Sequence, residues 1–418
     1  MNILIKSATI LDSKSEFHNT TQDLLITDGI ITKIASNIKT PKDYQEISFD
    51  NLHISQGWFD SSVSFGEPGF EERDTIKNGL KTAALSGFTS VAVNANTNPV
   101  IDSNAHITFV NSKAHNHAVN LLPIGALTIG AKGEDLAELY DMTTAGAVAF
   151  YDYKKPIRNP NLLKIALQYA SNFNGLVCSF PQECKISTNG VMNENITSTT
   201  LGLKGIPALA EELQIARDLF LLEYTGGKLH IPTISTAKSA DLIRVAKSKK
   251  LDVTCSVAIH NLYFTDAHLN DFDTNFKVLP PLRIQSDIDA LIEGVKDGTI
   301  DMVTTDHTPI DIELKKIEFD HAEYGTIGLE SAFGALQSIF TIKKTIEILT
   351  RGKSRFGLEA PSIALGNKAN LSLFNPDIKY VFSKNDIVSK SKNAIFENES
   401  LKGKVYGIVA NNQTVLKS

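Results

Sequence analysis

Residues 147–179, AVAFYDYKKPIRNPNLLKIALQYASNFNGLVCS, contain a strand, a helix and a second strand in succession. The apolar runs at 147–150 and 176–179 predict two buried strands. Between them, residues 160–172 predict a helix, with Asn159 at the N-cap and Pro160 at the first helical position. Strand–helix–strand units of this kind place their two strands in parallel. The stretch therefore predicts one unit of a parallel sheet covered by helices.

The same alternation extends over about 300 residues. Further helices are predicted at residues 74–86, 135–142, 207–224, 239–249 and 286–297, and further strands at 89–93, 121–124, 229–232, 253–257 and 302–305. This number of repeats fits a closed (β/α)8 barrel, which we expect from residue 53 to residue 358.

Both ends of the chain predict strands and turns instead. Strands are expected at residues 3–10, 23–26 and 30–34, with Asp28-Gly29 as a hairpin turn, and again at 371–374, 405–409 and 413–416. We therefore predict that residues 1–52 and 359–418 together form one small β domain.

The composition is that of a globular protein and excludes several classes. Of 418 residues, 42% are hydrophobic and 21% charged, so a disordered or coiled-coil chain is excluded. The 41 basic and 47 acidic residues give a net charge of -6, which argues against a nucleic-acid partner. Three cysteines fit a reducing compartment. Lys6, Ser7 and Asp12 interrupt the first apolar run, so we expect no signal peptide, no membrane contact and a cytoplasmic location.

In barrels of this type the chemistry lies at the carboxyl ends of the strands. The predicted strand ends carry polar residues, among them Asp60, Asn94, Asp152, Ser179, Thr233, His260 and Asp306-His307. A hydrolytic metal centre usually needs three or more histidine or carboxylate ligands, and this ring offers few. Nucleophile and phosphate-binding motifs are absent from the sequence. The residues alone thus predict a barrel with a weak site.

Several short motifs occur together along the chain. They are Gln56-Gly57-Trp58-Phe59-Asp60, Glu67-Pro68-Gly69, Asn96-Thr97-Asn98-Pro99, Pro280-Pro281-Leu282-Arg283, Thr305-Asp306-His307-Thr308-Pro309 and Gly328-Leu329-Glu330. In this combination the chain resembles the dihydroorotase family, within the amidohydrolase superfamily, and its long bacterial type above all. The resemblance covers essentially the whole chain. It implies an amidohydrolase-type barrel, zinc as the family's cofactor and hydrolysis of a cyclic amide C–N bond.

The resemblance also implies six metal-ligand positions, of which four carry hydroxyl side chains here. The positions of the family's histidines are occupied by Ser62, Ser64, Ser179 and Thr233. The positions of its aspartates retain Asp152 and Asp306. A neutral hydroxyl is too weakly basic to replace imidazole on zinc. We therefore predict no binuclear zinc centre and no bound cofactor, with the two aspartates as remnants of the metal site and Asp306 as the catalytic remnant.

The positions that bind the substrate carboxylate in the family are changed as well. An arginine position is Gly66 and a histidine position is Ile310, and Asn96 alone is retained. Neither glycine nor isoleucine can pair with a carboxylate, so bidentate recognition is lost. We predict that replacing the four hydroxyl residues by histidine recovers metal binding, and that activity needs Gly66→Arg and Ile310→His in addition.

These expectations combine into a dihydroorotase-like protein of pyrimidine biosynthesis that is catalytically inactive and has a structural or assembly role. The resemblance implies aspartate carbamoyltransferase as a partner, and a homodimer is a second expectation. One alternative is an active dihydroorotase, or another cyclic amidase, with an altered metal site at Asp152 and Asp306. Another is a binding module that holds a small ligand in the emptied pocket.

Overall fold

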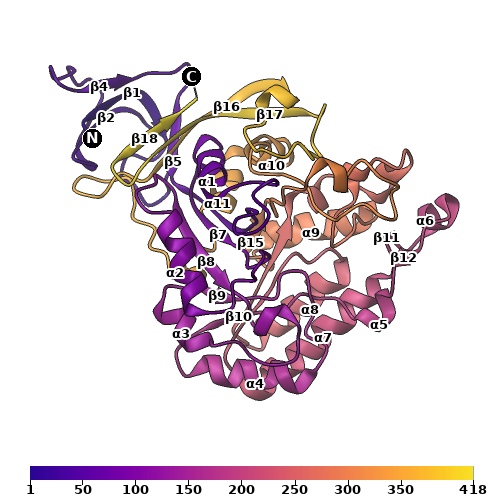
Figure 1. The fold of residues 1–418 in the computed structure, drawn as a ribbon. Helices are drawn as coiled ribbons and strands as arrows, with labels where there is room; N and C mark the ends of the chain where they lie inside the picture. Colours follow the sequence, from indigo (N-terminus) through magenta and orange to yellow (C-terminus); the bar gives the residue numbers. More distant parts are fainter. Residues whose placement is uncertain (418) are drawn as a thin grey trace.

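A computed structural model describes residues 1–417 as a parallel barrel joined to a second, largely antiparallel sheet (Figure 1). The strands of the barrel are β6 (Trp58–Val63), β7 (Phe88–Val93), β8 (Asn120–Gly125), β9 (Ala149–Phe150), β10 (Leu176–Cys178), β13 (Lys228–Ile231), β14 (Val253–Ala258) and β15 (Met302–Thr304). They pair in this order, and every pair is parallel. A parallel bridge between Val63 and His307 joins the last strand to the first. The predicted (β/α)8 architecture is confirmed.

Helices follow most of these strands and cover the outside of the barrel. They are α1 (Ile76–Leu85), α2 (Asn104–Lys113), α3 (Leu139–Thr144), α4 (Pro160–Ser171), α7 (Ala208–Thr225), α8 (Ala237–Ser248), α9 (Gln285–Asp297), α10 (Ala332–Ile339) and α11 (Ile342–Thr350). The Asn159 side chain caps α4 by accepting from the Asn161 amide, and Pro160 is the first helical residue, as the sequence predicts. The predicted helix at 135–142 begins instead after Glu138, and α2 was not predicted because only Ile107 and Val110 among its residues are buried.

The second sheet contains strands from both ends of the chain. Its strands are β1 (Ile3–Ile10), β2 (Thr21–Thr27), β3 (Ile30–Ala35), β4 (Gln45–Ile47), β5 (His53–Gln56), β16 (Leu371–Val381), β17 (Ser400–Ala410) and β18 (Gln413–Leu416). The order β18-β17-β16-β5-β1-β2-β3 places the amino-terminal and carboxyl-terminal strands side by side (Figure 1). A β structure formed by both termini is therefore confirmed. The exact division at residues 52/53 and 358/359 stays a prediction. The strand β5, which begins at residue 53, pairs with this sheet.

A small arm between β10 and α7 was not foreseen. It contains α5 (Cys184–Ser187), β11 (Met192–Asn193), α6 (Ile196–Leu201) and β12 (Gly205–Ile206). In Figure 1 it projects from the side of the barrel. Its elements are two to six residues long, too short for a periodic pattern to reveal them.

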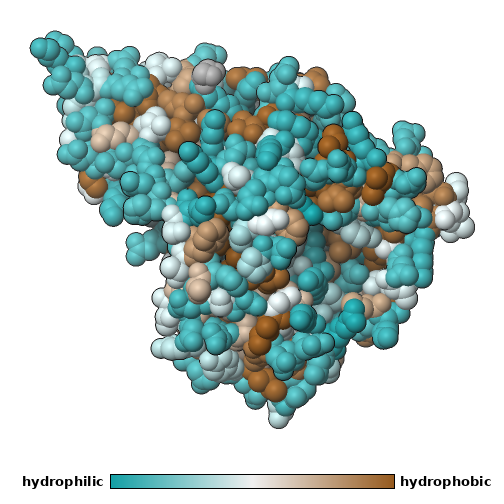
Figure 2. All heavy atoms as spheres, viewed as in Figure 1, coloured by the Kyte–Doolittle hydropathy of each residue, from teal (hydrophilic) through white to brown (hydrophobic). Residues whose placement is uncertain are grey.

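The interior of the barrel wall is apolar and the outer surface is mainly hydrophilic. Trp58 on β6 is fully buried and stacks on Phe333 of α10, with ring centroids 4.9 Å apart. Figure 2 shows one face of the molecule, on which hydrophobic residues gather in small groups, one of them over α4. Among residues 1–417, none of the helices is long and apolar enough to cross a membrane.

Candidate functional site at the barrel mouth

The first strand, β6, contributes Asp60 and Ser62 to the mouth, and Ser64 directly follows it. Asp60 is buried and ties the first strand to the last, since it accepts hydrogen bonds from the Thr304 hydroxyl (2.5 Å) and the Thr305 amide (2.9 Å). The two serine hydroxyls accept from one amide group, the Nδ2 of Asn94, at 3.1 and 3.4 Å. Asn94 follows β7, so the neighbouring strand holds both hydroxyls in place.

Asp152 follows β9, and its carboxylate binds the neighbouring loop. Its Oδ1 accepts from the amides of Leu127 and Thr128 at 2.8 and 2.9 Å, and its Oδ2 accepts from the Thr128 hydroxyl. The residue is buried, and burial raises the pKa of its carboxyl above the ordinary value against these hydrogen bonds. The 127–128 loop therefore covers the carboxylate and uses its acceptor capacity.

Ser179 directly follows the strand β10, and Thr233 lies two residues after the end of β13. The Ser179 hydroxyl donates to Oδ2 of Asp218 on α7 at 2.6 Å, so it links the barrel to an outer helix. The Thr233 hydroxyl is buried and has no hydrogen-bond partner among the described residues. These two hydroxyls therefore have different surroundings, although the family resemblance gives them one role.

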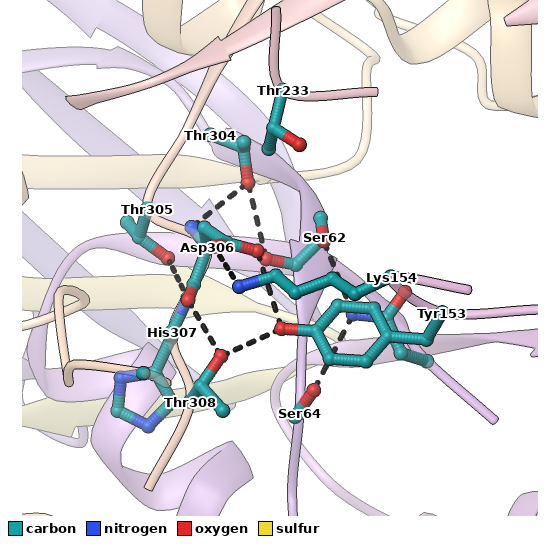
Figure 3. Close-up of polar contacts among 12 residues, drawn as sticks. Ser62, Ser64, Tyr153, Lys154, Thr233, Thr304, Thr305, Asp306, His307 and Thr308 are labelled. Atoms are coloured by element: carbon teal, nitrogen blue, oxygen red, sulfur yellow. Dashed lines mark hydrogen bonds and ion pairs between the residues drawn. The ribbon is translucent and has the colours of Figure 1, made fainter. Parts of the chain in front are cut away.

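Lys154 and Asp306 form the central contact of the mouth (Figure 3). The Lys154 Nζ lies 2.7 Å from Oδ2 of Asp306, and their side chains are 10% and 2% exposed. The Tyr153 hydroxyl lies 3.3 Å from the other carboxylate oxygen and 2.7 Å from the Thr308 hydroxyl. Burial opposes the charge of Lys154, but the Asp306 carboxylate outweighs burial and raises the pKa of the ammonium above its ordinary value. Burial also raises the pKa of the Asp306 carboxyl, and the Lys154 ammonium opposes this shift.

The backbone at three of these positions is in the left-handed region. Lys154, Thr233 and Asp306 have φ angles of 55°, 48° and 48°. For residues with a β-carbon this conformation costs on the order of 1 kcal/mol or more, and it concentrates at functional sites. The strand ends thus keep an unfavourable conformation that aims Lys154 and Asp306 at each other.

Two histidines stand near the mouth without charge. His307 accepts hydrogen bonds at Nδ1 from the amides of Gly328 (3.1 Å) and Leu329 (3.4 Å), which makes it a structural residue at the closing strand. The Nε2 of His260 is buried and unpartnered among residues 1–417. Burial and the Lys154 charge lower the pKa of His260 to about 3.

The residues that the resemblance places at the substrate positions have surroundings different from those of the Lys154–Asp306 pair. Asn96 is half-buried, and its Oδ1 has no partner among the described residues. Ile310 is buried, and its amide donates to Oδ1 of Asn393. At Gly66 an added β-carbon would lie 1.8 Å from the carbonyl oxygen of Phe70. The expectation that Gly66→Arg can rebuild an anion contact is therefore wrong for this backbone.

Sequence reasoning missed Lys154 and Tyr153 as site residues. The signal for Lys154 was the run Asp152-Tyr153-Lys154 directly after a predicted strand, where a cation stands two residues from a predicted ligand. Its pairing with a residue 152 positions away depends on barrel closure and has no sequence signature. The mouth therefore combines buried hydroxyls, one ion pair and neutral histidines.

Comparison with known proteins defines the class of this barrel. The L-hydantoinase (dihydropyrimidinase) from Arthrobacter aurescens matches with a TM-score of 0.85 at 18% identity, covering 100% of this chain and 96% of that one. A D-hydantoinase structure matches with a TM-score of 0.82 at 19% identity, covering 100% and 95%. At such identities the likeness concerns the fold alone, which is a parallel barrel joined to a sheet of terminal strands.

Sequence comparison is more specific. Residues 53–239 match the family model described as dihydro-orotase-like. A dihydroorotase of Pelotomaculum thermopropionicum is 39% identical, covering 100% of this chain and 99% of the relative. One from Ruminiclostridium cellulolyticum is 40% identical over the same shares. The chain belongs to the dihydroorotase family, as its motifs indicate.

Proposed function

We propose that this chain is a catalytically inactive member of the dihydroorotase family with a structural or assembly role in pyrimidine biosynthesis. Its full-length relatives named dihydroorotase support the assignment to that pathway. The observation that carries the inactivity is the buried ion pair of Lys154 with Asp306. At a position where the family resemblance implies a zinc ligand, the carboxylate is neutralised by an ammonium of the chain itself.

The donor chemistry of the mouth does not fit a pair of zinc ions. Zinc in proteins is held by cysteine, histidine and carboxylate ligands. Within residues 1–417, no three such side chains are grouped so that they could hold a metal ion. Asp152 is engaged by Leu127 and Thr128, and Asp306 by Lys154. The remaining positions of the resemblance offer neutral hydroxyls at Ser62, Ser64, Ser179 and Thr233, which are poor zinc ligands.

The residues present also lack a group that could replace the metal in hydrolysis. Attack on an amide needs a nucleophilic water and a polarised carbonyl. Lys154 cannot accept a proton from water near neutral pH, since the pKa of its ammonium is raised. Asp306 is held by that ammonium, and His307 uses Nδ1 to bind the backbone. These contacts stabilise the mouth and occupy the Asp306 carboxylate and the His307 Nδ1. His260, whose pKa is lowered to about 3, is only a weak proton acceptor.

The direct test combines metal content with activity. The full chain is purified without chelators, its zinc is measured by plasma mass spectrometry, and hydrolysis of dihydroorotate and cyclisation of carbamoyl aspartate are assayed. The Pelotomaculum thermopropionicum relative serves as the matched positive control. We expect well below one zinc per chain and no turnover. Two zinc ions per chain, or turnover that Asp306→Ala abolishes, would overturn the proposal and favour an active amidase with an altered site.

The proposed assembly role concerns aspartate carbamoyltransferase, the partner that the resemblance implies. One outer face supports such a contact: α7 leaves Leu209, Leu213, Phe220 and Tyr224 exposed by 54, 48, 71 and 77%. Their spacing of four, seven and four residues aligns them along the helix, and an apolar patch of this kind marks an interaction surface. Sedimentation of the chain with and without aspartate carbamoyltransferase tests this, and Phe220→Glu should abolish a shared boundary. A dimer of this chain alone would assign the face to a second copy instead.

A further inference from the structure

A cavity lies at the amino end of the barrel, opposite the mouth. Its volume is about 850 Å³, within the range of small-molecule sites. Its walls come from the segment after β1, from α11 and from the short 3₁₀ helix η6 (Lys353–Phe356). The position of the cavity follows from Lys353. The Nζ of this residue donates at 2.5 Å to the carbonyl of Gly57, which directly precedes β6. This basal cavity therefore lies between the terminal sheet and the barrel and shares no residue with the mouth.

Basic side chains outnumber acidic ones in the lining of the basal cavity. The cations are Lys14, Lys343, Arg351 and Lys353, and the acids are Asp12 and Glu347. Both acids are already engaged. Asp12 accepts from the amides of Lys14 and Ile363 and from the Gln56 side chain, and Glu347 pairs with Lys344 and Arg351. Among residues 1–417, the three lysines of the lining form no ion pair.

Lys353 is the most informative of these groups. It is buried, with 4% of its surface exposed, and its only hydrogen-bond partner among the described residues is the Gly57 carbonyl. Burial and, to a smaller extent, the charge of Lys14 lower the pKa of Lys353 to about 8, and Asp12 opposes this shift. A buried ammonium beside a second cation raises the free energy of the empty cavity. A bound anion would remove that penalty.

Two further nitrogens belong to residues of the same lining. The Nε of Arg351 and the Nδ1 of His18 have no hydrogen-bond partner among residues 1–417. Buried N–H groups are normally hydrogen-bonded, so the unpartnered Nε–H of the Arg351 guanidinium calls for an acceptor. The hydroxyls of Ser13 and Ser354 also belong to the lining. Cations, N–H groups and hydroxyls together match the oxygens of a phosphate group better than a single carboxylate.

We propose that the basal cavity binds a small phosphorylated molecule that carries at least two negative charges. Residues of three separate chain segments hold it, with Lys14 and Lys343 at the exposed rim and Lys353 at the buried end. Because Lys14 lies beyond β1 and Lys343 lies on α11, a bound anion would join the terminal sheet to the barrel. The site is independent of the metal chemistry at the mouth.

The test measures binding by the full chain and needs no activity. Isothermal titration is performed with inorganic pyrophosphate and with ATP, and sodium sulfate at equal ionic strength controls for general salt effects. We expect binding of at least one of the two probes. Equal affinities assign recognition to the phosphates alone, whereas tighter binding of ATP assigns a further contact to the organic part.

The variants locate the site. In Lys14→Ala/Lys343→Ala, two exposed residues are changed, and we expect the dissociation constant to rise on the order of tenfold or more, as for the loss of direct charge contacts. Lys33→Ala, an exposed lysine of β3 outside the lining, is the matched control and should change it less than twofold, roughly as expected of a distant, screened charge. Absence of binding to both probes at millimolar concentration would overturn the proposal. Equal affinities of the double variant and the wild type would overturn it as well.

Discussion

The ammonium of Lys154 lies 2.7 Å from the carboxylate of Asp306, and both side chains are almost completely removed from solvent. The two residues come from the ends of β9 and β15, which lie at different points of the barrel circumference. An ion pair in such a place balances the charge of an aspartate that would otherwise be buried alone. The same ion pair therefore affects both the stability of the fold and the capacity of the mouth to bind a metal ion.

Loss of the Lys154 charge is expected to destabilise the fold. Lys154→Met leaves Asp306 buried without its cation, and breaking a buried pair from one side costs about 3–5 kcal/mol of unfolding free energy. Guanidinium unfolding at pH 7 measures this loss. The double variant Lys154→Met/Asp306→Asn removes both charges and should recover more than half of it. A single-variant loss of about 1 kcal/mol or less, typical of a surface pair, would show that the contact is not buried in solution.

The same ammonium should limit any rescue of the metal site. We expect the fourfold histidine variant to bind Co²⁺ weakly, since Lys154 competes for Asp306; its substitutions are Ser62→His, Ser64→His, Ser179→His and Thr233→His. Adding Lys154→Ala should tighten Co²⁺ binding at least tenfold, roughly the effect of removing one adjacent like charge. Visible absorption of tetrahedral Co²⁺ measures both affinities. Equal Co²⁺ affinities with and without Lys154 would show that the ion pair does not hinder metal binding.

Gly66→Arg should fail as part of that rescue. The new β-carbon would meet the Phe70 carbonyl at 1.8 Å, so the loop must move before any side chain can be placed. We expect Gly66→Ala alone to lower the thermal midpoint by several degrees, about the effect of 1–2 kcal/mol in unfolding free energy. Gly133→Ala is a suitable comparison, because Gly133 also lies in a loop but has open space around its β-carbon position. Its φ of 73° adds only the backbone penalty.

Asp152 is expected to act as a loop anchor. Asp152→Ala leaves the Leu127 and Thr128 amides without their acceptor and should cost about 2–4 kcal/mol of unfolding free energy. Asp152→Asn keeps one carbonyl oxygen for these amides, so its loss should be smaller. Urea unfolding of the two variants compares them, and the zinc content should be the same in both. If either variant contained less zinc than the wild type, this would indicate that Asp152 is a metal ligand.

Two buried histidines predict destabilisation by acid. Burial lowers the pKa of both His230 and His260 to about 3, against 6.5 in the unfolded chain. Between these values the unfolded state binds more protons, so stability is full above pH 6.5 and is lost as the pH falls toward 3. Each histidine contributes up to about 1.4 kcal/mol per pH unit. The unfolding free energy of His260→Gln should therefore depend less steeply on pH between 6 and 4 than that of the wild type, and identical slopes would contradict the assignment.

Local sequence patterns were enough to identify the architecture and the family. The barrel is encoded by local patterns, such as apolar strands at 147–150 and 176–179 and a helix begun by Asn159-Pro160, and these need no distant contact to be recognised. The resemblance assigns Ser62, Ser64, Ser179 and Thr233 to the metal-ligand positions of the family, and this assignment stays a prediction. The arm at residues 184–206 escaped prediction because its elements are too short to repeat.

The contacts that the site residues make became known from the three-dimensional structure. Two aspartates that looked equivalent in sequence proved different, since Asp152 binds the adjacent loop and Asp306 binds Lys154. Gly66 looked like a lost contact, but the nearby Phe70 carbonyl leaves no room for a side chain. Closure of the barrel brings together residues more than 150 positions apart, and such proximity follows from strand order and burial. No local pattern contains that information, because the free energy of an ion pair depends on the solvent that the whole fold removes.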